Sequence, residues 1–156
     1  CMTSIIHKLN NNIDYTIFDL PEINLLQYYY LKSQNIDSNL DDIDKNINLL
    51  SNIKLLKKKL EILKSKNKSI LLIANWSFSE MPIKLREELE FLFLNCNYGI
   101  ISFQSYFEEI SNVSYFEKLK KKLEFNYNSS IDTINEMNGK FNSNKYYTFL
   151  IKKKEN

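Results

Sequence analysis

Glycine is almost absent from this chain of 156 residues, which carries only Gly99 and Gly139. A Gly-rich phosphate-binding loop needs several glycines close together, so no loop of that type lies within this sequence. The two cysteines, Cys1 and Cys96, form no disulfide framework and match no metal-ligand spacing. His7 is the single histidine, so a histidine metal cluster is excluded, and its position in a predicted helix beside Lys8 gives no support for a serine–histidine catalytic pair.

Long hydrophobic runs and an excess of one charge are also missing. No apolar stretch approaches the roughly 18 residues that a membrane-spanning helix needs, and the start of the sequence lacks a signal-peptide pattern. Lys and Arg number 21 against 19 Asp and Glu, a balance that argues against a nucleic-acid-binding protein. The low cysteine content favours a reducing compartment, so we expect a cytoplasmic protein.

The residues that are present predict a folded α/β domain. Hydrophobic residues make up 44% of the chain and aromatic residues 13%, which is enough for a buried core. No linker or repeat divides the sequence, so we expect one domain over residues 1–156. Short β-prone segments alternate with helical patterns of about 10 to 15 residues, which predicts a mostly parallel, doubly wound sheet.

The expected elements follow from the spacing of apolar residues. We expect strands at 15–18, 69–76 and 98–104, helices at 22–32, 53–63, 85–96 and 113–123, a loop at 35–45, and either a strand or a helix start at 47–50. Two late β-prone segments, 125–134 and 146–151, are separated by the turn-like Asn138–Gly139 and no full helix. They predict an antiparallel hairpin at the edge of the sheet.

Ligands of parallel sheets bind beyond the carboxyl ends of the strands, and Asp19 lies at the first such end. Its carboxylate can accept two hydrogen bonds from a ribose diol, while Leu20 and Pro21 make a rigid turn that aims it. Asp19 can equally cap the helix that begins near Pro21, and one residue can do both.

Two further strand ends carry polar residues. After the strand core of residues 70–74, Trp76 offers a stacking face, Ser77 and Ser79 offer hydroxyl groups, and Glu80 offers a carboxylate for general base catalysis. The alternative is that Ser79 caps a helix and Trp76 belongs to the core. At the third strand end, Gln104 can contact a substrate or satisfy the backbone of a loop.

Three blocks of the sequence resemble the sugar O-methyltransferase family. Residues 15–22 (Tyr-Thr-Ile-Phe-Asp-Leu-Pro-Glu), together with the segment 25–31, are similar to its second strand and helix. Residues 74–82, with Arg86 downstream, resemble its Trp-Ser-x-Ser-Glu block, and residues 101–112 match a third block in the right order. The Asp-Leu-Pro step is also similar to one in small-molecule O-methyltransferases.

The resemblance implies a class I methyltransferase fold, a Rossmann-like sheet of seven strands whose last strand is antiparallel. It also implies S-adenosylmethionine as cofactor and a sugar hydroxyl of a glycan or nucleotide-sugar precursor as substrate. The expected cofactor contacts are Asp19, which holds the ribose, Leu20, Pro21, Asn75 and Trp76. The expected catalytic residues are Glu80 and Ser79, and the expected substrate contacts are Ser77 and Gln104.

Compared with that family, the sequence lacks the first strand and its Gly-rich turn. We therefore expect a fragment of a longer protein or a decayed gene product, with weak cofactor binding and little or no activity alone. Two other functions stay open: an NAD-dependent Rossmann-type oxidoreductase in which Asp19 binds the adenosine ribose, and a non-catalytic remnant that acts as an interaction module. The sequence predicts no metal ligands and no membrane span, and it leaves a homo-oligomer open.

Overall fold

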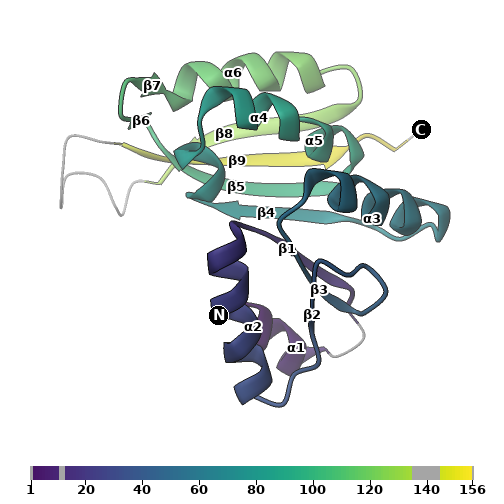
Figure 1. Ribbon diagram of the computed structural model, residues 1–156. Coiled ribbons are helices and arrows are strands. Elements are labelled where there is room, and N and C mark those ends of the chain that lie inside the picture. The colour runs from purple at the N-terminus through teal and green to yellow at the C-terminus, as the bar shows by residue number, and fades with distance from the viewer. Residues whose placement is uncertain (1, 11–12, 135–144, 156) are drawn as a thin grey trace. The chain divides into compact units, whose positions relative to one another are not determined.

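The computed structural model describes residues 2–10, 13–134 and 145–155, and these form an α/β fold of alternating helices and strands (Figure 1). The chain divides into two compact units, Cys1–Asn67 and Lys68–Asn156, here the first unit and the second unit. Each is described by itself, so the expectation of a single domain stays a prediction. The turn expected at Asn138–Gly139 lies outside the described residues.

The first unit is built around three parallel strands in the order β1-β3-β2. Its elements are α1 (Met2–Leu9), β1 (Tyr15–Phe18), α2 (Pro21–Ser33), β2 (Asn39–Leu40), β3 (Ile47–Leu50) and α3 (Ile53–Ser65). The segment 47–50 is thus a strand, one of its two expected states. The loop expected at 35–45 is wrong at β2, because pairing with β3 makes these two residues a strand despite their polar surroundings.

The middle strand β3 forms the centre of the first unit, and all four of its residues are buried. Ile47 and Leu49 pack with Leu31 of α2 and with Ile36 in one hydrophobic cluster. Near-continuous burial is what a strand with a parallel neighbour on each side shows. This core holds the carboxyl ends of β1 and β3 side by side.

The second unit contains a four-stranded sheet in the order β4-β5-β9-β8. Its elements are β4 (Leu71–Asn75), the 3-10 helix η1 (Ser77–Glu80), α4 (Ile83–Leu89), α5 (Phe91–Asn95), β5 (Tyr98–Gln104), β6 (Tyr106–Phe107), β7 (Ile110–Ser111), α6 (Asn112–Leu123), β8 (Tyr127–Thr133) and β9 (Tyr146–Lys153). β4 and β5 are parallel, whereas β9 is antiparallel to both β5 and β8. The expected antiparallel pair at the sheet edge is confirmed, with β8 as the edge strand.

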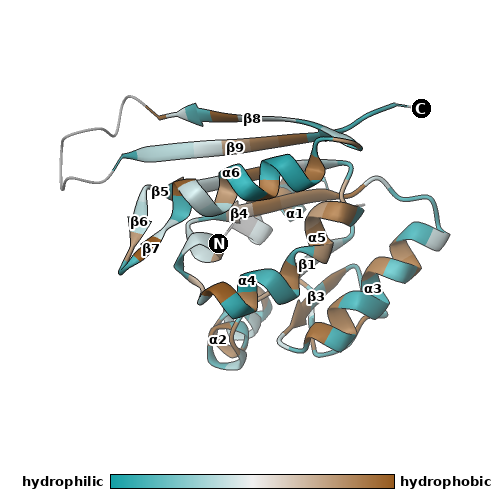
Figure 2. Cartoon of the chain, turned by 90° about the horizontal axis from the view of Figure 1, so that it is seen from above, coloured by the Kyte–Doolittle hydropathy of each residue, from teal (hydrophilic) through white to brown (hydrophobic). Residues whose placement is uncertain are grey.

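One face of this sheet packs against the helices α4, α5 and α6 (Figure 1). Along β5, Ile101 and Phe103 are fully buried, and the buried Phe116 of α6 packs against Phe103 with the two rings tilted by 31° and their centroids 4.2 Å apart. The alternate residues Tyr98 and Ile100 are 46% and 41% exposed. Figure 2 shows the mixture of hydrophobic and hydrophilic residues along α4 and α6 that is typical of amphipathic helices. The doubly wound arrangement, which needs helices on both faces, stays a prediction.

Candidate functional site

In the first unit, Asp19 follows β1 directly, as expected. Its Oδ1 accepts a hydrogen bond from the Leu20 N–H at 2.8 Å, and its Oδ2 accepts one from the Gln27 side chain at 3.3 Å. The N-cap of α2 is Leu20, with Pro21 at the first helical position. A capping carboxylate would instead accept from an N–H one turn further along. The half-buried Asp19 carboxylate is therefore held at the strand end without being used as a helix cap.

Asn24, which the sequence did not single out, fixes the backbone at this strand end. It is fully buried, and its Nδ2 donates to the Leu50 carbonyl at 3.0 Å, to the Ser51 hydroxyl at 2.9 Å and to the Asp19 carbonyl at 3.3 Å. These bonds connect the end of β1 with the end of β3 through the first turns of α2. The same helix also contains Glu22, Gln27 and Lys32, so one more polar residue, five positions after Asp19, gives no distinctive signal in the sequence.

In the second unit, Trp76 directly follows β4 and has an unusual backbone conformation. Its φ of 64° and ψ of −42° lie on the side of conformational space that bulky residues rarely adopt. The Trp76 N–H donates to the Ser102 carbonyl at 2.9 Å, and its ring meets the Tyr146 ring edge to face with centroids 5.1 Å apart. Such a conformation persists only where the surroundings enforce it.

The carbonyl of Trp76, at the start of the short helix η1, accepts the hydrogen bonds that hold this helix. It accepts hydrogen bonds from the Ser79 N–H at 2.8 Å, the Ser79 hydroxyl at 2.7 Å and the Glu80 N–H at 3.1 Å. Ser79 is fully buried, and its hydroxyl donates to a carbonyl instead of accepting from a backbone N–H. The N-caps of η1 and α4 are Trp76 and Pro82, so the capping alternative for Ser79 is wrong. Asn75, Ser77 and Glu80 are exposed, so these three side chains are accessible to a ligand.

Gln104, the last residue of β5, lies at the same edge as Trp76. Its backbone is the register partner of Tyr146, whose ring contacts Trp76. The Gln104 carbonyl accepts a hydrogen bond from the Asn112 side chain at 2.8 Å. The structure thus brings Trp76 and Gln104 together in the second unit, whereas Asp19 belongs to the first unit.

A buried arginine, Arg86, lies close to this edge of the sheet. In the sequence it accompanies the block of residues 74–82, and no role was predicted for it. Arg86 of α4 is fully buried and is the only arginine in the chain. Burial lowers the pKa of its guanidinium, which lies 5.3 Å from the centre of the Tyr115 ring. Burial and the neighbouring Glu90 carboxylate raise the pKa of Tyr115 above its usual range, so the phenol stays neutral.

Two aspartates, Asp37 before β2 and Asp42 after it, are held by neighbouring residues. Asp37 lies 3.0 Å from both Lys45 and Lys32, and hydrogen bonds from these two ammonium groups lower the pKa of its carboxyl. The Asp44 N–H and the Asn39 side chain lower the pKa of Asp42 in the same way. In the described ranges no group of three or more His, Cys, Asp or Glu side chains is arranged to hold a metal ion.

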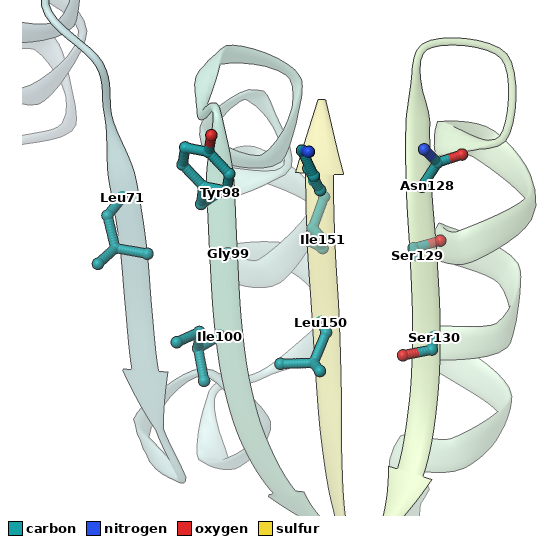
Figure 3. Close-up of a pocket in the computed structure, with 10 residues that line it drawn as sticks. Leu71, Tyr98, Gly99, Ile100, Asn128, Ser129, Ser130, Leu150 and Ile151 are labelled. Atoms are coloured by element: carbon teal, nitrogen blue, oxygen red, sulfur yellow. The ribbon is translucent and has the colours of Figure 1, made fainter. Parts of the chain in front are cut away.

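A shallow pocket of about 560 Å³ lies on the sheet of the second unit, over residues of β4, β5, β9 and β8 (Figure 3). Leu71, Tyr98, Ile100 and Leu150 give it apolar walls, and Ser129 and Ser130 give it polar ones. None of the predicted site residues lines this pocket. Over the part of the chain that the structure describes, no helix is both long and apolar enough to span a bilayer.

Comparison with known proteins adds little to this geometry. No protein-family model matches the chain, and no curated protein matches it. Among solved structures, the chain is similar to one described as the methyltransferase domain of bacterial CtHen1-C, at 12% sequence identity and a TM-score of 0.42. The match covers 99% of this chain and 96% of that one. A likeness this weak does not establish a shared fold or a shared activity.

Proposed function

We propose that this chain is part of an S-adenosylmethionine-dependent methyltransferase that acts on a sugar hydroxyl of a glycan or nucleotide-sugar precursor. The observation that carries the proposal is the half-buried Asp19 carboxylate, held at the carboxyl end of β1 by Leu20 and Gln27. The three blocks that resemble sugar O-methyltransferases support it. So does the last strand, β9, because that family's sheet also ends in an antiparallel strand.

The residues of the first unit fit the ribose part of the cofactor. A ribose diol offers two donors, and an ionised carboxylate only accepts. Each Asp19 oxygen accepts one hydrogen bond in the structure and keeps a further lone-pair site. Leu20 is 64% exposed and Pro21 is exposed, so both can border the adenosine. Because the sequence holds no Gly-rich turn for the methionine part, we expect this chain alone to bind the cofactor weakly.

The second unit supplies the groups that we assign to the reaction. Bound S-adenosylmethionine supplies a methyl group on a positively charged sulfur. The exposed Glu80 carboxylate accepts the proton of the sugar hydroxyl while the carbon–oxygen bond forms and the carbon–sulfur bond breaks. Ser77 and Gln104 hold substrate hydroxyls, and Asn75 and Trp76 contact the cofactor.

Saturation-transfer NMR of the chain with S-adenosylhomocysteine tests this function, because the method detects weak binding. We expect saturation of the adenine and ribose protons, and none for NAD⁺ added at the same concentration. No transfer to S-adenosylhomocysteine, or transfer to NAD⁺ alone, would contradict the proposal. The second result would favour the oxidoreductase.

A methyl-transfer assay separates catalysis from binding. The chain is incubated at high concentration with methyl-labelled S-adenosylmethionine and a panel of nucleotide sugars, and the label in the sugar fraction is counted. Glu80→Gln should lower any transfer with S-adenosylhomocysteine binding kept. The exposed Glu88→Gln, which removes the same charge on α4, serves as the control. Normal transfer by Glu80→Gln would remove Glu80 from the mechanism.

A further inference from the structure

The guanidinium of Arg86 forms hydrogen bonds in three directions within the second unit. Its Nε donates to the Met81 carbonyl at 2.7 Å, its Nη2 donates to the Ser79 carbonyl, and its Nη1 donates to Asn112 Oδ1 at 2.7 Å. Among the described residues these partners are carbonyl and amide oxygens, not carboxylates. A buried charge without a counter-charge is costly unless such acceptors surround it. The carbonyls of Met81 and Ser79 and the side-chain oxygen of Asn112 therefore stabilise this one buried cation.

Asn112 forms hydrogen bonds through both the oxygen and the nitrogen of its side-chain amide. It is fully buried at the start of α6, where its Oδ1 accepts from Arg86 and its Nδ2 donates to the Gln104 carbonyl at 2.8 Å. Its own N–H donates to the Ser105 carbonyl at 3.0 Å. Asn112 thus connects Arg86 with the point where the chain leaves β5.

Two segments at the carboxyl edge of the sheet are therefore held by the same side chain, Arg86. Arg86 holds the turn of residues 76–81 through two carbonyls, and through Asn112 it holds the exit from β5. The turn of residues 76–81 carries Trp76 in its costly left-handed conformation, as well as the exposed Ser77 and Glu80. The three nitrogens of the planar guanidinium each donate to a different acceptor, and the single nitrogen of a lysine ammonium does not reproduce that spacing.

We propose that Arg86 and Asn112 are a positioning pair, which fixes the turn of residues 76–81 and the exit from β5 in the conformation that a ligand meets. Neither side chain touches the ligand, because both are fully buried. The proposal concerns the shape of this edge and does not depend on methyl transfer.

The tryptophan fluorescence of the chain reports on this turn alone, because Trp76 is the only tryptophan in the sequence. Its emission maximum and its quenching by acrylamide report the packing of this turn without any ligand. We expect Arg86→Lys to shift the emission to longer wavelength and to increase the quenching constant at least twofold, with far-ultraviolet circular dichroism unchanged.

A general loss of stability must be told apart from this local effect. Leu119→Ala is the matched control, because Leu119 is buried in α6 of the same unit and has no part in the Arg86 bonds. At temperatures where both variants are folded, the control should quench like the wild-type chain. Equal quenching in the control and in Arg86→Lys, or wild-type quenching in Arg86→Lys, would overturn the proposal.

Two variants of Asn112 decide the question if Arg86→Lys does not fold. Asn112→Asp and Asn112→Leu both lose the donor to Gln104, but only the aspartate keeps an acceptor for Arg86. We expect near-wild-type quenching of Trp76 in Asn112→Asp and at least twofold stronger quenching in Asn112→Leu. Indistinguishable quenching in the two variants would contradict a role through Arg86.

Discussion

The ammonium of Lys59 lies 2.9 Å from the carboxylate of Asp14, although only 4% of the Lys59 side chain is exposed. Lys59 also donates to the carbonyls of Ile43 and Lys45, at 3.1 and 3.3 Å. One buried lysine of α3 therefore holds both the residue before β1 and the segment that leads into β3.

Removing the carboxylate of this pair should cost more than replacing the lysine by an apolar residue of similar length. Asp14→Ala leaves a buried ammonium without its counter-charge, and we expect it to lower the free energy of unfolding by about 3 kcal/mol. Lys59→Met leaves the Asp14 carboxylate without its partner, but 29% of that side chain is exposed and water can solvate it, so this change should cost less. Urea unfolding followed by circular dichroism measures both, and an equal or larger loss in Lys59→Met would contradict this ranking.

Gly99 of β5 is one of two glycines, and the space beside it is nearly filled. A Cβ at this position would lie 3.1 Å from Ile151 Cδ1 and 3.4 Å from Ile151 Cβ. Gly99→Ala should therefore cost less than about 1 kcal/mol, because a flexible methyl group can move, whereas Gly99→Leu should cost about 2 kcal/mol or more through overpacking.

Shortening the neighbouring side chain, Ile151, provides the control. Gly99→Ala combined with Ile151→Val should be more stable than the sum of the two single changes by roughly 0.5 kcal/mol, since the tight methyl contact is gone. Strict additivity in thermal or urea unfolding would show that Ile151 does not limit the space.

Cys96 should make the chain less stable at high pH. Burial raises the pKa of its thiol from 9.0 to about 11. The unfolded chain releases this proton first, so the free energy of unfolding falls as the pH rises from about 9 through 11, by at most about 1.4 kcal/mol per pH unit from this group. Cys96→Ala lacks this contribution. The stability difference between wild type and Cys96→Ala should narrow over that range, and a constant difference would refute it.

Ser79→Ala distinguishes a structural role of this buried hydroxyl from the catalytic role that the resemblance implies. The buried hydroxyl donates to the Trp76 carbonyl at 2.7 Å, and its loss should lower the free energy of unfolding by about 1 kcal/mol. We expect binding of S-adenosylhomocysteine to be unchanged. A loss of methyl transfer with unchanged stability would instead make Ser79 part of the chemistry.

Much of the fold follows from local patterns in the sequence. The strands 15–18 and 98–104 have the bounds that the apolar runs predict, since a short apolar run bounded by turn residues is a local signal. β2 was missed, because two residues in an acidic stretch become a strand only through pairing with β3. The helix expected at 85–96 is divided at Glu90, which the apolar stripe does not show.

The residues of the candidate site also divide into those with a local signal in the sequence and those without one. Asp19 and Trp76 were found because each directly follows a β-prone run, which is visible in the sequence. Asn24 was not found, and Asn112 was noted only as part of the third block of resemblance, without a role. The importance of both lies in hydrogen bonds to residues 26 and 8 positions away along the chain. Burial of a polar side chain is decided by tertiary contacts, and a single sequence carries little record of them.

The most direct measurement of the proposed function compares three chains for S-adenosylhomocysteine binding by NMR titration. They are the wild-type chain, Asp19→Asn, and Glu22→Gln, which removes the same charge from the exposed first turn of α2. A hydrogen bond to a charged group contributes about 1.5–3 kcal/mol, so Asp19→Asn should weaken binding about tenfold or more, while Glu22→Gln binds like the wild type. Equal affinities for Asp19→Asn and the wild-type chain would contradict the assignment of Asp19 to the cofactor ribose.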